Sequence, residues 1–311
     1  MDQSASLFAR SGSALYVSFK PSLCTRPVQL PSIDPSMVFV IAQSFVAADK
    51  HDTAPLCYNL RVVECALAAE VLARKLGSIA LPKDAGPLSV SLRGLHDAYF
   101  EKSEGIADNL EVSKREFAKQ LQILVRLTEK TLSKHEGYSR EEISDVLHIS
   151  VDELDKRYMS KFSVRAERFM LRQRALHVYT EAARVLSFME ILEHPPNESE
   201  DLLRKLGSIM NETQESCRTA YDCSCVELDE LCSLARSAGA YGSRLTGAGW
   251  GGCSVHLMAA DKVDEIKQVW IEKFYKKRFP DMTEEKLAEA IVVSKPGSGS
   301  CIFDLTASPI T

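Results

Sequence analysis

Residues 243–253 read SRLTGAGWGGC, and four of the six residues 247–252 are glycine. Glycine adopts positive φ angles readily and lets another backbone or an anion approach closely. Successive N–H groups in such a turn can form a nest that binds anions. The stretch therefore predicts a phosphate-binding turn, with a plain tight turn between a helix and a strand as the alternative. The candidate residues are Gly247, Ala248, Gly249, Gly251 and Gly252.

Two common glycine-rich nucleotide motifs do not fit this stretch. Residues 247–252 match the pattern Gly-x-Gly-x-x-Gly, but dinucleotide-binding folds place a helix directly after the glycines. Here residues 253–258 predict a strand. The corresponding loop of protein kinases has valine two places after its last glycine, where this chain has Ser254. We exclude both interpretations.

The rest of the chain predicts an α+β fold. Residues 14–19 and 38–42 are β-branched and aromatic runs of strand length, joined by a proline-rich connection. From Tyr58 onward, apolar residues recur every three or four positions, which is typical of amphipathic helices. The predicted helices cover about 58–76, 117–132, 139–158 (two short helices with capping boxes), 165–192 and 202–238. After the glycine turn we expect a strand at 253–258, a helix at 263–278, and strands at 291–294 and 302–305.

Composition and charge exclude several classes of protein. The chain has 311 residues, 45% of them hydrophobic and 26% charged, with a net charge of −5. These values are typical of a globular protein and argue against disorder. No basic run predicts a nucleic-acid partner or a membrane surface, and no apolar run approaches the roughly 20 residues of a membrane span. With nine cysteines, an odd count, and no secretory signal, we expect a cytoplasmic protein.

Two further clusters have plain structural interpretations. Cys217, Cys223, Cys225 and Cys232 lack Cys-x-x-Cys spacing and a nearby histidine, so we expect ordinary helix there and no metal site. Residues 139–158 carry more acidic than basic side chains. A helix that reads DNA needs cations that face phosphates, so we expect a helical hairpin.

Two single residues, Asp2 and Tyr58, are candidates for ligand contact only because of their positions in the sequence. Asp2 is a lone carboxylate at the start of the chain, where backbones usually fray. Tyr58 opens a predicted helix in the sequence Tyr-Asn-Leu-Arg. An aromatic side chain beside polar groups at a helix start often contacts a ligand, and packing is the alternative.

Together these segments resemble the galactokinase family of the GHMP (galactose, homoserine, mevalonate and phosphomevalonate) small-molecule kinases. The stretch 243–253 looks like the family's C-terminal motif in its galactokinase form, which has Trp250 among the glycines. Residues 1–3, Met-Asp-Gln, look like the motif that carries the catalytic aspartate. Residues 58–65, 173–179 and 223–229 fit the same family. The resemblance runs from residue 1 to about residue 305, and it is strongest to fungal galactokinases and to N-acetylgalactosamine kinases.

This resemblance implies transfer of the γ-phosphoryl group of ATP to the anomeric hydroxyl of galactose. Asp2 would bind the sugar and act as the base, or at least as the group that orients and polarises the sugar hydroxyl. Tyr58 would contact the sugar, and the turn at 247–252 would shape the phosphate site. ATP and Mg²⁺ are the implied cofactors. The implied fold has two lobes, with residues 1–48 as a remnant of the N-terminal (S5-like) kinase domain and 49–311 as the C-terminal domain.

The chain also departs from the family pattern. Members carry a Gly-Arg-x-Asn-x-x-Gly-Glu-His segment and a Gly-Leu-Ser-Ser-Ser-Ala-type phosphate loop before Met-Asp-Gln, and these 311 residues contain neither. We therefore expect the metal ligands in that preceding part. We also expect this chain to be an incomplete form that is inactive alone and prone to aggregate. Two alternatives stay open: an N-acetylgalactosamine kinase, against which Tyr58 weighs modestly, and a galactose sensor that contacts a transcriptional repressor.

Overall fold

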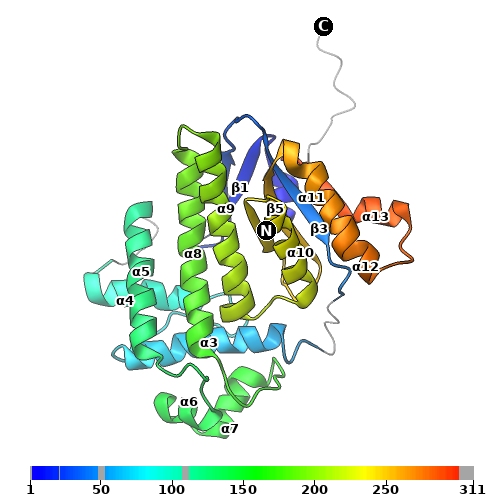
Figure 1. Cartoon of the computed structure of the whole chain (residues 1–311). Helices are drawn as coiled ribbons and strands as arrows, with labels where there is room; N and C mark the ends of the chain where they lie inside the picture. Colours follow the sequence, from blue (N-terminus) through cyan, green and yellow to red (C-terminus); the bar gives the residue numbers. More distant parts are fainter. Residues whose placement is uncertain (1, 21, 48–52, 107–111, 301–311) are drawn as a thin grey trace, which may run out of the picture.

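The computed structural model describes residues 2–20, 22–47, 53–106 and 112–300, and of Asp2 the backbone alone. A layer of long helices packs beside one antiparallel sheet, and a separate two-stranded hairpin lies next to the helices (Figure 1). This arrangement confirms the predicted α+β class. Every helix among the described residues is too short or too polar to cross a bilayer.

The four-stranded sheet joins distant parts of the chain. Its order is β4 (Gly242–Leu245), β5 (Cys253–Ala259), β3 (Met37–Gln43) and β6 (Ile291–Ser294), with all neighbours antiparallel. The β-branched and aromatic residues of β3 favour a strand, and every second residue of it is buried. Strand β3 pairs with both β5 and β6, so the sheet joins a strand from residues 1–48 to strands from the C-terminal part of the chain. The domain boundary at residue 48 stays a prediction.

Before β3, a hairpin consists of β1 (Ser13–Ser18) and β2 (Cys24–Gln29), and helix α1 (Asp2–Phe8) precedes it. The sequence predicted β1 but not β2 or α1. Pro27 argued against a strand, yet it pairs with Leu15 in a sheet of only two strands, where each strand has a free edge that tolerates proline. Several large hydrophobic side chains of α1 and of the connection between β1 and β2 are more than half exposed: Leu7, Phe8, Phe19 and Leu23.

The helical layer contains the largest hydrophobic core. Helices α3 (Tyr58–Lys75), α5 (Lys114–Thr131) and α8 (Leu171–Glu193) were predicted, and their apolar faces pack together. Helix α4 (Leu92–Glu104) was missed, although the Ser91 hydroxyl caps its first turn by accepting from the Gly94 N–H.

Two short helices confirm the predicted helical hairpin. Ser139 and Glu142 form a reciprocal capping box at the start of α6 (Arg140–Leu147). Ser150 caps α7 (Val151–Leu154), which continues as the π-helical turn η1 (Asp155–Met159). Both caps satisfy N–H groups that a helix start would otherwise leave without partners.

The predicted single helix at 202–238 is wrong. The chain forms α9 (Ser199–Ser216), the π-helical turn η2 (Cys217–Tyr221) and α10 (Val226–Ser237). The break falls at Asp222, which has a left-handed conformation with φ 56°. Cys223 and Cys225 therefore lie in the connection between two helices, and not within ordinary helix as expected.

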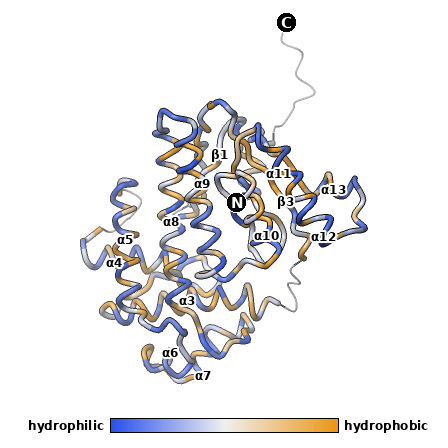
Figure 2. Tube along the Cα trace, in the orientation of Figure 1, coloured by the Kyte–Doolittle hydropathy of each residue, from blue (hydrophilic) through white to orange (hydrophobic). Residues whose placement is uncertain are grey.

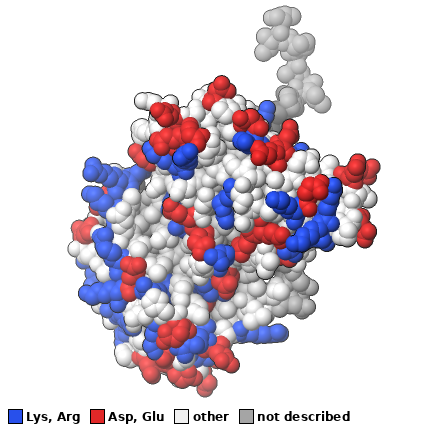
Figure 3. Space-filling model, in the orientation of Figure 1, with Lys and Arg blue, Asp and Glu red and all other residues white. Residues whose placement is uncertain are grey.

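The C-terminal helices cover one face of the sheet. Helix α11 (Val263–Trp270) continues through η4 (Ile271–Tyr275) into α12 (Lys276–Arg278), and α13 (Glu284–Ala290) leads into β6. Trp270 and Phe274 pack against β3 residues such as Val40, and Figure 2 shows hydrophobic residues of α11 and β3 on adjoining traces. The strand expected at 302–305 lies outside the described residues. Figure 3 shows cations and carboxylates interspersed over the visible face.

Candidate functional site

The glycine turn lies between two strands, and not between a helix and a strand as expected. It connects β4 to β5, and the Thr246 N–H donates to the Cys253 carbonyl at 3.0 Å. Positive φ angles occur at all four glycines, Gly247 (79°), Gly249 (88°), Gly251 (141°) and Gly252 (76°). The dense glycine spacing is thus required by the backbone path of the turn.

Two of these glycines touch other segments of backbone. A Cβ atom at Gly249 would lie 2.0 Å from the Cys223 carbonyl oxygen, and one at Gly251 would lie 2.4 Å from the Val46 carbonyl oxygen. The Trp250 N–H donates to the Cys223 carbonyl at 2.7 Å, and the Gly252 N–H donates to the Val46 carbonyl at 3.0 Å. The inner half of the turn, residues 249–252, therefore packs between the end of η2 and the end of β3.

The outer half of the turn, residues 246–248, is exposed to solvent. Thr246, Gly247 and Ala248 are exposed, and an added Cβ at Gly247 would meet no atom within 4 Å. The N–H groups of Gly247 and Ala248 have no hydrogen-bond partner among the residues that the structure describes. Unpaired N–H groups in consecutive positions suit an anion, and the phosphate-binding role of the turn stays a prediction.

Tyr58 lies at the first residue of α3 with 57% of its surface exposed, and its helix is joined to the turn through Arg61. The Arg61 guanidinium lies 5.7 Å from the centre of the Trp250 ring. It also donates to the carbonyl of Asp222 at 2.8 Å and to the Asp222 carboxylate at 2.7 Å. The Trp250 Nε1–H donates to the same Asp222 carbonyl at 3.2 Å. The structure thus brings the start of α3 and the glycine turn together.

A buried ion cluster fixes this arrangement. Glu64 is fully buried, and it accepts from Arg61 at 3.1 Å, from Arg174 at 2.6 Å and from the Met170 N–H at 2.7 Å. The two guanidinium groups are balanced by the carboxylates of Glu64 and Asp222. The cluster ties α3, α8 and the end of η2 into one unit. Its residues were not predicted from the sequence as site residues, although charges on the apolar faces of α3 and α8 were a signal.

Burial also sets the protonation of a thiol beside this cluster. Removal from water raises the pKa of Cys65 to about 11, so this thiol is neutral at pH 7. Its Sγ lies 4.0 Å from the Tyr221 hydroxyl. Cys65 therefore acts as packing, and not as a nucleophile.

A cavity of about 570 Å³ reaches the glycine turn at Thr246. Its walls come from β1, β2, the sheet and helices α8 and α9, and they are mostly apolar. At its polar end the Glu181 carboxylate accepts from Arg244 at 3.0 Å, from Arg184 at 3.0 Å and from the Thr213 hydroxyl at 2.8 Å. Burial alone would raise the pKa of Glu181, but these cations and the hydroxyl lower it, so the carboxylate is ionised at neutral pH.

Comparisons with known proteins agree on one family. Residues 199–277 match the family described as GHMP kinases C terminal. The galactokinase of Saccharomyces cerevisiae is 38% identical over 98% of this chain and 59% of its own length, and that of Schizosaccharomyces pombe is 39% identical over 98% and 60%. The chain is similar to galactokinases over nearly its whole length. It spans about 60% of the length of these curated relatives.

The galactokinase likeness extends to a solved structure. Lactococcus lactis galactokinase, solved in complex with galactose, aligns with 94% of this chain and 53% of its own chain, with a TM-score of 0.52 and 20% identity. At this identity the likeness shows the fold. The predicted GHMP-kinase architecture is thereby confirmed.

Asp2 was predicted as a site residue, and the structure describes its backbone alone. Its backbone opens α1, and its side chain lies outside the described atoms. Helix α1 accepts a backbone hydrogen bond from residue Ser300, whose N–H donates to the Ser6 carbonyl at 2.8 Å. That Asp2 faces the glycine turn across a shared cleft stays a prediction.

Proposed function

We propose that the protein represented by this chain phosphorylates galactose at its anomeric hydroxyl with ATP as the donor. The observation that supports this most is the 38–39% identity to galactokinases along 98% of the chain. A second support is independent of identity. The segments at 58–65 and 173–179, which look like galactokinase motifs, contact each other through Glu64 and Arg174. The segments at 58–65 and 223–229 both contact Trp250 of the turn, through Arg61 and Cys223.

The proposed roles follow from the placement of each group. Tyr58 presents an exposed ring and hydroxyl at the start of α3, where it binds the sugar. The open N–H groups of Gly247 and Ala248 bind phosphate oxygens, because oriented N–H groups stabilise charge that develops during phosphoryl transfer. Asp2 accepts the proton of the anomeric hydroxyl as the new phosphorus–oxygen bond forms.

ATP fits these residues better than Mg²⁺ does. The open outer half of the turn offers donors for phosphate oxygens. In contrast, no group of three His, Cys, Asp or Glu side chains among the described residues could hold a metal ion. We therefore assign no Mg²⁺ ligand to the described part of this chain and derive no step through the metal.

Fluorescence of Trp250 tests the proposal on this chain. The chain has two tryptophans, and Trp270 is fully buried, so a ligand near the turn changes the Trp250 signal alone. We expect saturable changes with galactose and with ATP, and a much smaller change with glucose, the C4 epimer. Tyr58→Ala should weaken galactose binding at least about tenfold, the scale of one lost polar contact, and leave ATP binding unchanged.

ADP formation that depends on galactose is assayed in the chain extended by the preceding segments that the family pattern implies, with Asp2→Asn as the variant. Loss of turnover with galactose binding retained supports the base assignment. A chain that binds neither galactose nor ATP contradicts the proposed function. Equal responses to galactose and to N-acetylgalactosamine would favour the alternative kinase.

A further inference from the structure

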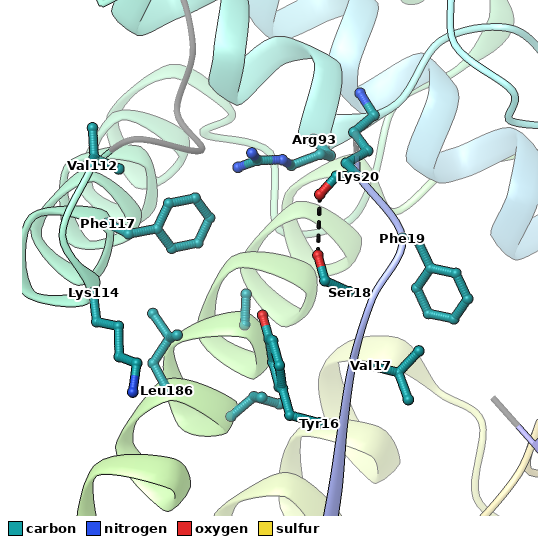
Figure 4. Close-up of a pocket in the computed structure, with 12 residues that line it drawn as sticks. Tyr16, Val17, Ser18, Phe19, Lys20, Arg93, Val112, Lys114, Phe117 and Leu186 are labelled. Atoms are coloured by element: carbon teal, nitrogen blue, oxygen red, sulfur yellow. Dashed lines mark hydrogen bonds between the residues drawn. The ribbon is translucent and has the colours of Figure 1, made fainter. Parts of the chain in front are cut away.

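A second cavity, of about 480 Å³, lies between β1 and helices α5 and α8 (Figure 4). It has no lining residue in the turn at 246–252 or in α3, so it is separate from the proposed galactose site. Pockets of about 300–1,000 Å³ are of the size that binds small organic molecules. The cavity is therefore large enough for a ligand of its own.

The cavity is lined by three cations and by no carboxylate among the described residues. The cations are Lys20, Arg93 and Lys114. Behind them, Asp97 accepts from Arg93 at 3.1 Å and faces Lys20 at 3.8 Å. Glu193 is likewise shared between Lys114 and a fourth cation. Because each carboxylate serves two cations, the cavity keeps an excess of positive charge that attracts anions.

The walls of the cavity are aromatic and aliphatic. The Phe117 ring is held in place, with the Arg93 guanidinium 4.9 Å from its centre and the His96 ring stacked on it at 4.7 Å. Leu186 of α8 lines the same space. Figure 4 shows the Tyr16 side chain pointing into the cavity, and its hydroxyl has no hydrogen-bond partner among the described residues. The cavity thus combines an aromatic and aliphatic wall, a free hydroxyl and a cationic rim.

We propose that this cavity binds a small organic anion with a flat apolar body, such as an aromatic carboxylate or a nucleoside monophosphate. The flat body packs against Phe117 and Leu186, as aromatic rings do in offset stacking. The anionic group accepts charge-assisted hydrogen bonds from Arg93 and Lys114, which are stronger than neutral ones. The Tyr16 hydroxyl supplies a further donor.

Calorimetric titration with matched pairs of ligands tests the proposal. The 311-residue chain is titrated with 2-naphthoate and with neutral 2-naphthamide, and then with AMP and with neutral adenosine. We expect the anion of at least one pair to bind about tenfold or more tighter than its neutral partner, as expected for a charge-assisted contact. The pair that responds distinguishes a carboxylate from a phosphate head group. Equal affinities within both pairs, or no binding by any of the four compounds, overturn the proposal.

Variants locate the binding at this cavity. Lys114→Gln and Arg93→Gln should each weaken the preferred anion about tenfold and leave the neutral partner unchanged. Arg115→Gln is the matched control, because Arg115 is exposed on the same helix and does not line the cavity. Lys114 is about half exposed, so its variant keeps the fold, which melting curves verify. Anion binding that Lys114→Gln and Arg115→Gln reduce equally would show non-specific attraction and overturn the assignment.

Discussion

At the scale of single residues, the glycines of the turn differ in what surrounds them. Gly249 and Gly251 each face a carbonyl oxygen of another segment, whereas Gly247 faces open space. Gly249→Ala should lower the free energy of unfolding by about 3 kcal/mol, from left-handed strain plus overpacking. Gly247→Ala introduces only the left-handed backbone strain and should lower the free energy of unfolding by about 1 kcal/mol. Urea denaturation of the two variants measures the difference.

A smaller loss for Gly249→Ala than for Gly247→Ala would contradict the wedged geometry of the turn. The sequence predicted a tight glycine turn, because glycine density alone indicates positive φ angles. It did not indicate which glycines touch neighbouring backbone. Those contacts come from Cys223 and Val46, and Val46 is more than 200 positions away in the chain.

The buried carboxylate of Glu64 carries a second prediction. Glu64→Gln leaves the guanidinium groups of Arg61 and Arg174 with one partner fewer in a water-free site. Breaking such a buried pair typically costs about 3–5 kcal/mol. We expect a loss of this size in the free energy of unfolding. Trp250 fluorescence should shift as well, because Arg61 lies against its ring.

Glu272→Gln is the matched control for that prediction. Glu272 pairs with Lys276 at the surface, where both side chains are more than half exposed. Exposed ion pairs contribute about 0–1 kcal/mol to stability, so we expect little change in the free energy of unfolding. If the two substitutions cost the same, the Arg61–Glu64–Arg174 cluster does not stabilise the fold as we infer.

At the scale of elements, helix caps were the most reliable signal in the sequence. The capping box at Ser139 was predicted and is present with both of its hydrogen bonds. Ser139→Ala should lower the free energy of unfolding by about 1 kcal/mol. Ser208→Ala, in the exposed middle of α9, should be neutral or slightly stabilising, because alanine has the higher helix propensity. Thermal denaturation that gives both variants the same sign would contradict the cap assignment.

Physical features explain why the sequence did not predict some of the elements. Strand β2 contains Pro27, and β4 has only four residues, so neither shows a clear alternation of polar and apolar side chains. The break between α9 and α10 was hidden by apolar periodicity that continues across Asp222. This break matters for the site, because it turns the carbonyl groups of Asp222 and Cys223 toward Arg61 and Trp250.

At the scale of the whole molecule, the sheet shows how far sequence reasoning reaches. Strands at 38–42 and 253–258 were both predicted, yet their pairing was not. The pairing sets Val40 opposite His256 across more than 200 residues of chain. Nothing local in either strand encodes that partner, because long-range register depends on how the apolar faces of both strands meet the same helices. The resemblance to galactokinases supplied the lobe architecture that periodicity alone did not.

Three buried histidines make the folded molecule sensitive to acid. Burial lowers the pKa of His256 to about 3 and the pKa values of His96 and His177 to about 4. In the unfolded chain these groups titrate near pH 6.5. Below pH 6.5 the unfolded state therefore binds protons that the folded state does not. The free energy of unfolding should fall by roughly 1.4 kcal/mol per pH unit for each histidine, down to its folded pKa.

Urea denaturation at steps between pH 7 and pH 4.5 measures this slope. His256→Gln should reduce the slope of the free energy of unfolding against pH by roughly 1.4 kcal/mol per pH unit, the contribution of one proton. We expect this reduction whatever the effect of the substitution on stability at pH 7. The imidazole of His256 contacts the hydroxyls of Ser243 and Ser254, and glutamine offers similar polar atoms there. His194→Gln, at a side chain that is 73% exposed, should leave the slope unchanged. An unchanged slope for His256→Gln would mean that this imidazole takes up a proton in the folded state, against the burial that the sheet imposes on it.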